Sequence, residues 1–296
     1  MTNLRDFVPS FLLHQKNINY IIIEERKDCM SEKETILNSQ KPITRESLKN
    51  DLINLGLKES DVILAHASMS KLGWVVGREV TIIDAILDVI KENGTLIMPS
   101  QSGENSDPIY WQNPPVPKEW IEIIKEHMPV FDPKRTPTRS MGKVVDNLLM
   151  HPACIRSNHP QVSFCGVGKY ASELLSNHEL TPGLGSGSPL QKLYDMHAKI
   201  LLLGVGYGNA TALHLPESKL ENVKKHKTGA KILKDNIPTW VEFEEISYDD
   251  EDFELLGEAF EKEHHVQKYQ IGNYECRLIN MVDLCDFASC WFKNNR

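Results

Sequence analysis

The sequence predicts an α/β fold, because stretches with the pattern of buried strands alternate along the chain with an amphipathic helix. Residues 61–67 and 95–99 are short, mainly apolar runs of strand length. Between them, residues 79–91 repeat apolar side chains at helical spacing, and Gly94 marks the end of that helix. This succession of strand, helix and strand is the local unit of an α/β domain.

A folded domain is expected to occupy residues 41–296. Its first helix is capped by Thr44 and ended by Gly56, which suits a left-handed C-cap. The buried face of this helix is formed by leucines at helical spacing: Leu48, Leu52 and Leu55.

Further elements follow along the domain. Residues 101–118 hold four prolines and are expected to form a long excursion that cannot donate a regular strand ladder. Ser188 followed by Pro189 predicts a helix start. The expected helices are residues 120–127, 141–149, 190–194 and 282–292, and the expected strands are residues 199–205 and 274–279.

The first 40 residues lack the pattern of a domain. Residues 20–23 are a short apolar patch without periodicity, and residues 31–41 are polar and unpatterned. We expect residues 1–40 to form a poorly ordered arm. Alternatively, Met30 is the start of the protein and residues 1–29 result from a mis-called start codon. The N-terminus does not have the pattern of a secretory signal.

Composition and charge exclude several classes of protein. Hydrophobic residues make up 41% and charged residues 25%, as in an ordinary globular protein. No apolar run approaches the roughly 20 residues of a membrane span. The net charge of −8 disfavours nucleic acid as a partner and permits a polycationic small molecule. Six cysteines without a Cys-x-x-Cys pair point to the reducing cytoplasm.

The segment that follows the first strand, residues 65–73, is a candidate anion site. It joins a strand to a helix, where backbone N–H groups meet phosphates. The residues concerned are Ser68, Met69, Ser70 and Lys71. An ordinary connection rich in small residues remains the alternative, since neither a GxGxxG nor a P-loop pattern is present.

A second candidate for phosphate binding is Thr138 with Arg139, which lie in a short basic stretch of this acidic chain. A guanidinium group offers a planar fork that suits phosphate, and a hydroxyl adds a neutral donor. The alternative is that Arg139 pairs with a surface carboxylate.

The sharpest catalytic candidate is His214. It follows three glycines at the end of a predicted strand, and Glu217 lies three residues later, on the same face if the segment is helical. An imidazole held by a carboxylate is suited to act as a general base near neutral pH. A buried structural histidine is the alternative, and the same choice applies to His159 in a polar loop.

Nucleophilic and metal chemistry have weaker signals. The segment around Ser186 resembles a GxSxG elbow only superficially, and Cys165 reads as a small apolar residue. His264 and His265 have no further ligands at metal spacing, so we expect no metal site. A hydrolase that uses Ser186 or Cys165 with a histidine stays open as an alternative.

Taken together, these segments resemble the aminoglycoside 3-N-acetyltransferase family, over about residues 44–291. The resemblance is carried by collinear segments: residues 66–77, 94–99, 107–117, 131–142, 157–164, 187–190, 203–206, 213–215 and 272–278. It implies helices packed around a mixed, mostly buried β-sheet, unrelated to the GNAT superfamily. It also implies a shared cleft for acetyl-coenzyme A and the antibiotic.

In this resemblance His214 matches the catalytic histidine and Glu217 an acidic position beside it. Pro216 departs from the alanine that is usual there; because proline fits only the first turn of a helix, His214 is expected at the helix start, which weakens the argument for a shared face.

The resemblance predicts an acyltransferase that acetylates the 3-amino group of a 2-deoxystreptamine aminoglycoside and confers antibiotic resistance. Attack would be direct, with His214 as base, and without a covalent enzyme intermediate. Ser68 to Lys71, Thr138 and Arg139 are expected to bind acetyl-coenzyme A. The residues expected to bind the cationic drug are Glu104, Asp107, His159 and Glu261. Another amine acceptor, thioester hydrolysis, or binding of coenzyme A or of the antibiotic without catalysis remain alternatives.

Overall fold

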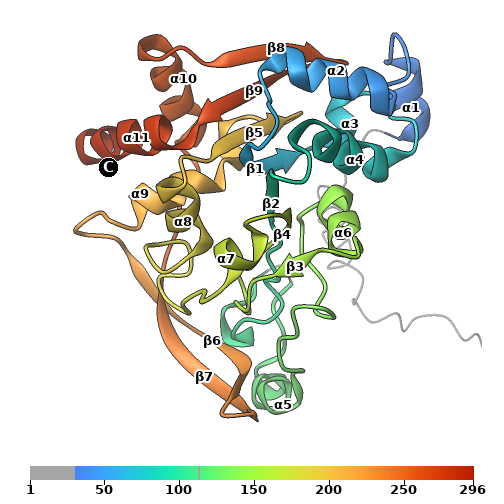
Figure 1. The fold of residues 1–296 in the computed structure, drawn as a ribbon. Coiled ribbons are helices and arrows are strands. Elements are labelled where there is room, and N and C mark those ends of the chain that lie inside the picture. Colours follow the sequence, from blue (N-terminus) through green and yellow to red (C-terminus); the bar gives the residue numbers. More distant parts are fainter. Residues whose placement is uncertain (1–30, 113) are drawn as a thin grey trace, which may run out of the picture.

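The computed structural model describes residues 31–112 and 114–296. Within them, the chain builds a seven-stranded mixed sheet in the order β3-β4-β2-β1-β5-β9-β8 (Figure 1). The central strand β1 is parallel to its neighbours β2 and β5, and the outer pairs are antiparallel. The bounds are β1 (Val62–Ala67), β2 (Thr95–Pro99), β3 (Ile155–Arg156), β4 (Phe164–Gly168), β5 (Lys199–Leu203), β8 (Gln267–Ile271) and β9 (Tyr274–Asn280). The predicted α/β class and mixed sheet are confirmed.

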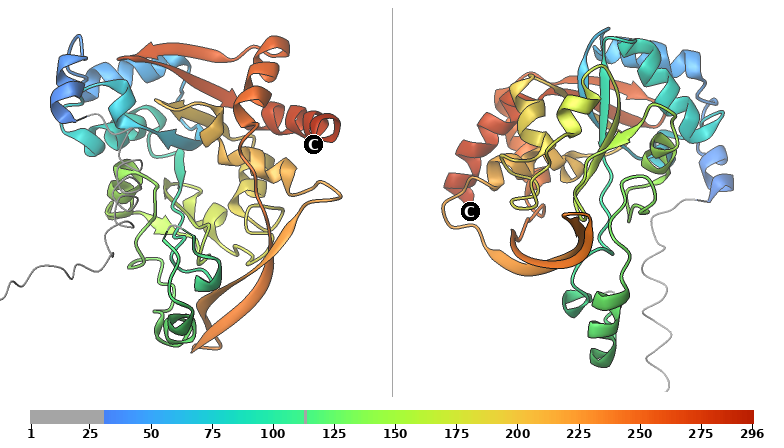
Figure 2. Two further views of the ribbon diagram at one scale, coloured as in Figure 1. Left: turned by 180° about the vertical axis from the view of Figure 1, so that it is seen from behind. Right: turned by 60° about the horizontal axis from the view of Figure 1, so that its bottom comes forward.

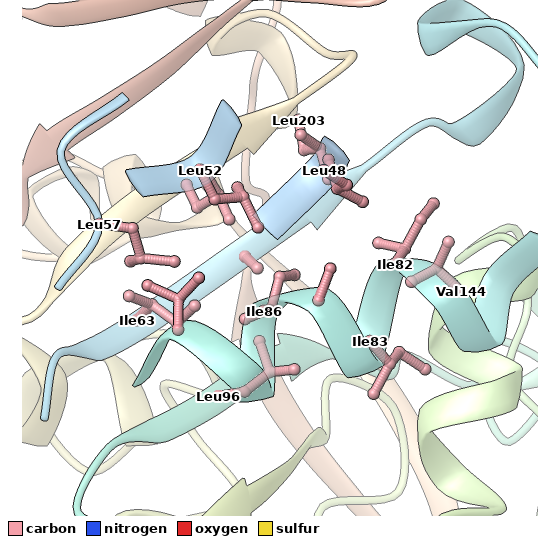
Figure 3. Close-up of a cluster of buried hydrophobic side chains, with 14 of the residues drawn as sticks. Leu48, Leu52, Leu57, Ile63, Ile82, Ile83, Ile86, Leu96, Val144 and Leu203 are labelled. Atoms are coloured by element: carbon pink, nitrogen blue, oxygen red, sulfur yellow. The ribbon is translucent and has the colours of Figure 1, made fainter. Parts of the chain in front are cut away.

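Helices cover both faces of this sheet, and the central strands alternate their side chains between two cores. Ile63 of β1 packs with α2 (Arg45–Leu55), α4 (Arg78–Ile90) and α6 (Lys143–Leu149), as Figure 3 shows. Leu64, the next residue, packs on the other face with α7 (Ala171–Leu175), α8 (Pro189–Asp195) and α11 (Met281–Asn295). The remaining helices are α1 (Glu32–Leu37), α3 (Met69–Leu72), α5 (Ile121–His127), α9 (His214–Glu217) and α10 (Phe253–Glu263).

A long hairpin of β6 (Lys225–Lys234) and β7 (Ile237–Ile246) stands apart from the main sheet. Its turn residues Asp235 and Asn236 both have positive φ, as a tight hairpin turn requires. Figures 1 and 2 show the hairpin reaching down to α5. There the N–H of Phe131 donates to the carbonyl of Lys231 at 3.0 Å. The hairpin was not predicted, because its charged and polar residues obscure the strand alternation.

The expected N-terminal arm falls in two parts. Residues 1–30 lie outside the described residues. Within residues 31–40 the expectation of an unpatterned segment is wrong, since α1 begins at a capping box formed by Ser31 and Glu34. The hydroxyl of Ser39 accepts the N–H of Trp74 at 2.7 Å, which fastens this segment to the domain.

Most other predicted elements are confirmed. Thr44 caps α2 and Gly56 ends it in the left-handed region, and the hydroxyl of Ser188 accepts the N–H of Leu190 at the start of α8. The proline-rich excursion holds two short 3-10 turns, residues 108–110 and 118–120. No helix of the described chain has the length and apolar character that crossing a membrane requires.

Candidate active site

The carboxyl ends of the parallel strands β1 and β5 meet at the edge of the sheet where the site forms. Ser68, after β1, donates its N–H to the carbonyl of Leu203 at the end of β5, at 2.9 Å. The next residue, Gly204, has a φ of +75°, and a Cβ there would lie 2.4 Å from the carbonyl oxygen of Ser68. Only glycine permits this approach of the two backbones.

From Gly204 the chain runs through two 3-10 turns, residues 207–209 and 211–213, into α9. His214 is the first residue of α9, as Pro216 led us to expect. The shared face nevertheless exists: Nδ1 of His214 lies 2.6 Å from Oε2 of Glu217. Because an ionised carboxylate only accepts hydrogen bonds, Nδ1 carries the proton and Nε2 keeps the lone pair.

Two aromatic rings flank the imidazole of His214. The ring centroids of Tyr248 and Phe253 lie 5.0 Å and 4.9 Å from that of His214. Tyr248 is itself anchored, since its hydroxyl accepts the N–H of Leu184 at 3.1 Å. The side chain of His214 is only 13% exposed. Packing and one hydrogen bond thus fix the orientation of the ring.

His214 lines a cavity of about 220 Å³ at the ends of β1, β2 and β5. Polar groups from separate segments meet there with it, among them His66, Gln101, Ser140 and Asp250. With Nδ1 occupied by Glu217, Nε2 is the ring nitrogen available to a molecule in this cavity. The arrangement is suited to remove a proton from a bound group.

His66 is a second histidine of the same cavity, on β1. Burial lowers its pKa to about 3, and the nearby His214 contributes to this shift. Its Nε2 atom is buried and has no hydrogen-bond partner in the described structure. His66 is therefore neutral at physiological pH. Sequence reasoning missed it as a site residue, although it is the first residue of a segment that carries the family resemblance, residues 66–77.

A neighbouring cavity of about 300 Å³ shares Ala67 with the first and holds three of the predicted coenzyme residues, Ser68, Met69 and Ser70. The N–H of Ser68 is already used by Leu203, so this residue offers its hydroxyl rather than its backbone. Lys71 is exposed and is not part of this lining. Two cations that were not predicted, Arg78 and Lys143, line the cavity.

Thr138 and Arg139 lie away from that cavity. The hydroxyl of Thr138 donates to Asp146 at 2.5 Å, and Arg139 forms an ion pair with Glu104 at 3.1 Å. The pairing of Arg139 with a surface carboxylate, which we kept as the alternative, is therefore observed. Its partner, Glu104, is a residue that we assigned to the cationic substrate.

Arg139 and Asp107 line a third cavity, of about 400 Å³. This cavity shares Gln101, Ser140 and Met141 with the catalytic cavity. The carboxylate of Asp107 is buried and bonds to Lys125 at 2.8 Å. The catalytic cavity, which His214 lines, thus shares lining residues with both of the others.

His159 and Glu261 have structural partners instead. Nδ1 of His159 accepts the N–H groups of Gln161 and Val162, Nε2 contacts the carbonyl of Leu180, and burial lowers the pKa of the ring to about 4. Neither His159 nor Glu261 lines the three cavities.

Glu261 bonds to Lys268, to Arg277 at 2.7 Å and to the hydroxyl of Tyr207 at 3.1 Å. Burial would raise the pKa of Glu261, but these two cations outweigh it and lower the pKa. Asp250, in the loop between β7 and α10, is the carboxylate that lines the catalytic cavity. Its only sequence signal was membership of the acidic stretch 242–263, which reads as a solvated surface.

Comparisons with known proteins identify the family of this chain. The sequence model described as aminoglycoside 3-N-acetyltransferase matches residues 64–293. The SPbeta prophage-derived aminoglycoside N(3')-acetyltransferase-like protein YokD of Bacillus subtilis is 43% identical over 86% of this chain and 94% of its own length. Aminoglycoside N(3)-acetyltransferase VII of Streptomyces paromomycinus is 29% identical over 89% of this chain and 96% of its own length.

Solved structures give the same result. The crystal structure of YokD superposes with a TM-score of 0.87 at 42% identity, covering 89% of this chain and 98% of that one. AAC-IIIb, in a binary complex with CoASH, superposes with a TM-score of 0.77 at 27% identity, covering 86% and 97%. The chain belongs to the aminoglycoside 3-N-acetyltransferase family of acyltransferases.

Proposed function

We propose that this protein transfers an acetyl group from acetyl-coenzyme A to the 3-amino group of a 2-deoxystreptamine aminoglycoside, with His214 as the general base. The observation that carries the proposal is the position of His214, held by Glu217, in a cavity that shares lining residues with two others. One of these two cavities is available to the acyl donor and the other to the amine, and the base lies in the cavity that adjoins both.

The chemistry requires a base of this kind. An aliphatic amine is mostly protonated at neutral pH and has no lone pair with which to attack a thioester. Nε2 of His214 accepts the proton, and the imidazolium that forms is stabilised by Glu217 at Nδ1. The amine nitrogen then bonds to the acetyl carbon and the C–S bond breaks, so that coenzyme A leaves as a thiolate without needing prior protonation. The nitrogen loses its second proton as the amide forms, and the thiolate or solvent takes it up.

His66 is the candidate donor to the acetyl oxygen, which becomes negative during attack. Alternation along β1 puts its side chain on the same face of the sheet as Leu64, the face that α9 covers. Being neutral, the ring can donate an N–H without competing for the proton of the amine.

Charged groups in the three cavities are available to both substrates. Arg78 and Lys143 on the Ser68 side are suited to the phosphates of the coenzyme. For the ammonium groups of an aminoglycoside, the candidate carboxylates are Asp250 in the catalytic cavity and Asp107, which pairs with Lys125, in the third cavity. The net charge of −8 favours the approach of a polycation.

Release of free thiol from acetyl-coenzyme A in the presence of gentamicin, kanamycin, tobramycin or neomycin tests the proposal. We expect turnover with at least one of them, an acetylated product by mass spectrometry, and a raised inhibitory concentration in a susceptible host that produces the protein. His214→Ala should lower kcat by about 10²- to 10⁴-fold while coenzyme binding persists. Absence of turnover with all four drugs would overturn the substrate class. A cytoplasmic location stays a prediction.

A further inference from the structure

We propose that Arg296 is a positioning residue of this site: it fixes the carboxylate of Glu217 from behind and thereby keeps His214 in its active orientation. The inference rests on the proposed function of His214 as the base. It is carried by the contacts of a single guanidinium group.

The contacts of Glu217 account for both of its oxygens. Oε2 faces Nδ1 of His214, whereas Oε1 lies 2.6 Å from Nη1 of Arg296 and 2.9 Å from the N–H of Asp249. The side chain of Glu217 is only 4% exposed. A carboxylate this deeply buried stays ionised only when it is paired and hydrogen-bonded, and Arg296 supplies the cation.

The guanidinium group of Arg296 has several further partners. Nε donates to Asp252 at 2.8 Å, Nη2 also bonds to Asp252, and Nη2 donates to the carbonyl of Asp249 at 2.6 Å. The guanidinium group lies 4.2 Å from the ring centroid of Phe292. Burial would lower the pKa of Arg296, but the hydrogen bonds to Asp252 and Glu217 outweigh it and raise the pKa. The group is a fixed, permanent cation.

Positive and negative groups alternate from His214 through Glu217 and Arg296 to Asp252. A protonated His214 is followed by the carboxylate of Glu217, the guanidinium of Arg296 and the carboxylate of Asp252. Asp252 partly neutralises the positive charge of Arg296. The negative charge of Glu217 can therefore still stabilise an imidazolium at His214. Arg296 therefore orients Glu217 without cancelling its effect on His214.

A fourth cavity, behind Glu217, explains why this support is needed. A cavity of about 1020 Å³ is lined by Glu217, Arg296, Asp249 and Asp252, but not by His214. Glu217 thus has the catalytic cavity on one side, through His214, and this rear cavity on the other. Arg296 occupies the position from which water would otherwise reach Oε1 and release the carboxylate from its present rotamer.

The test compares Arg296→Ala, Arg296→Lys and Arg45→Ala in steady-state acetyl transfer. Arg45 is the matched control, because it forms a similar two-carboxylate ion pair with Asp84 and Asp88 away from the site. We expect Arg296→Ala to lower kcat by about 10- to 100-fold, the scale for loss of a group that orients a functional histidine. Both Michaelis constants should stay unchanged, since Arg296 lines neither substrate cavity. Arg296→Lys should retain an intermediate rate.

Chemical rescue separates positioning from a merely structural role. The rear cavity leaves room for a small cation, so low millimolar guanidinium chloride should restore part of the kcat of Arg296→Ala and leave Arg45→Ala unaffected. If Arg296→Ala does not fold, Asp252→Asn loosens the same guanidinium group and should show a smaller loss of kcat. Full activity of Arg296→Ala, or a loss that appears equally in both Michaelis constants and is not rescued, would overturn the inference.

The two proposals fail in distinguishable ways. If the natural enzyme acetylates its substrate and His214→Ala does not, full activity of Arg296→Ala removes only the role of Arg296. If no acceptor is found, the downfield imidazole N–H resonance of His214, identified by its loss in His214→Ala, still reports the contact. We expect this resonance to shift or broaden in Arg296→Ala; an unchanged resonance would overturn the positioning role independently of activity.

Discussion

Nδ1 of His214 and Oε2 of Glu217 lie 2.6 Å apart, joined across one turn of a four-residue helix. This bond fixes which ring nitrogen carries the proton. The negative charge of Glu217, and not only the size of its side chain, is therefore expected to matter for the reaction.

Glu217→Gln is expected to lower kcat by about 10²- to 10⁴-fold with little change in fold. The amide keeps the size of the carboxylate but offers an N–H, which favours the tautomer of His214 with its lone pair at Nδ1. Steady-state kinetics with circular dichroism measures both effects. Glu261→Gln is a suitable control, because its carboxylate pairs with Lys268 and Arg277 and lines none of the three adjoining cavities. Equal rates for Glu217→Gln and the natural enzyme would contradict the assigned role.

The structure changes our expectation for coenzyme binding. Arg78→Ala and Lys143→Ala should each raise the Michaelis constant for acetyl-coenzyme A by about tenfold, as loss of a charged hydrogen bond costs roughly 1.5 kcal/mol. Arg139→Ala, which the sequence led us to expect would behave in this way, should instead alter the constant for the amine, because Arg139 lines the cavity of Asp107. Initial rates with each substrate varied in turn decide between the two assignments.

Asp250→Asn should weaken binding of the cationic acceptor and leave acetyl-coenzyme A unaffected. Its carboxylate lines the catalytic cavity, where an ammonium group of the acceptor would lie, and removing the charge should raise the acceptor's Michaelis constant by about tenfold. The neighbouring Glu251 lines the rear cavity, so Glu251→Gln serves as the control. Equal effects of the two substitutions would indicate only a general change of surface charge.

Stability should decrease as the pH falls below about 6.5. Burial lowers the pKa of His66 and His178 to about 3 and that of His159 to about 4. Each of these rings titrates near 6.5 in the unfolded chain, so between about pH 4 and 6.5 the unfolded state binds more protons. Each can contribute up to about 1.4 kcal/mol per pH unit to the decline of the free energy of unfolding. His159→Gln should reduce that slope in urea titrations by about one proton; an unchanged slope would show that His159 is charged when folded.

Local patterns predicted the parts of the site that lie close together in sequence. His214 and Glu217 are three residues apart, and Ser68 to Ser70 follow directly after a recognisable strand, so spacing made them candidates, whereas their roles came from the family resemblance. The order of strands in the sheet was not predicted: the family resemblance implied only a mixed, mostly buried sheet, and periodicity does not specify which strands pair.

Contacts between residues that are far apart in the sequence could not be predicted from local patterns. Arg296 reaches Glu217 only because α11 packs beside α9 in the second core, and no pattern near either residue indicates this. The pairing of Arg139 with Glu104 likewise depends on how the proline-rich excursion folds back, where Arg139 donates its N–H to the carbonyl of Gln101. A structural role for His159 was an alternative from the sequence, but its burial could not be decided there, because a polar loop gives no sign that it is covered.

Gly204 has a consequence for how this scaffold tolerates change. The main chain at the end of β5 packs against the carbonyl of Ser68. Contact between these two backbones therefore fixes the distance between the segment of Ser68 and the segment that leads to His214. Side chains in either outer cavity can therefore be exchanged, to admit a different acyl group or a different amine, without altering that separation. A single methyl group at residue 204 would push these two backbones apart and would impair the reaction with every substrate.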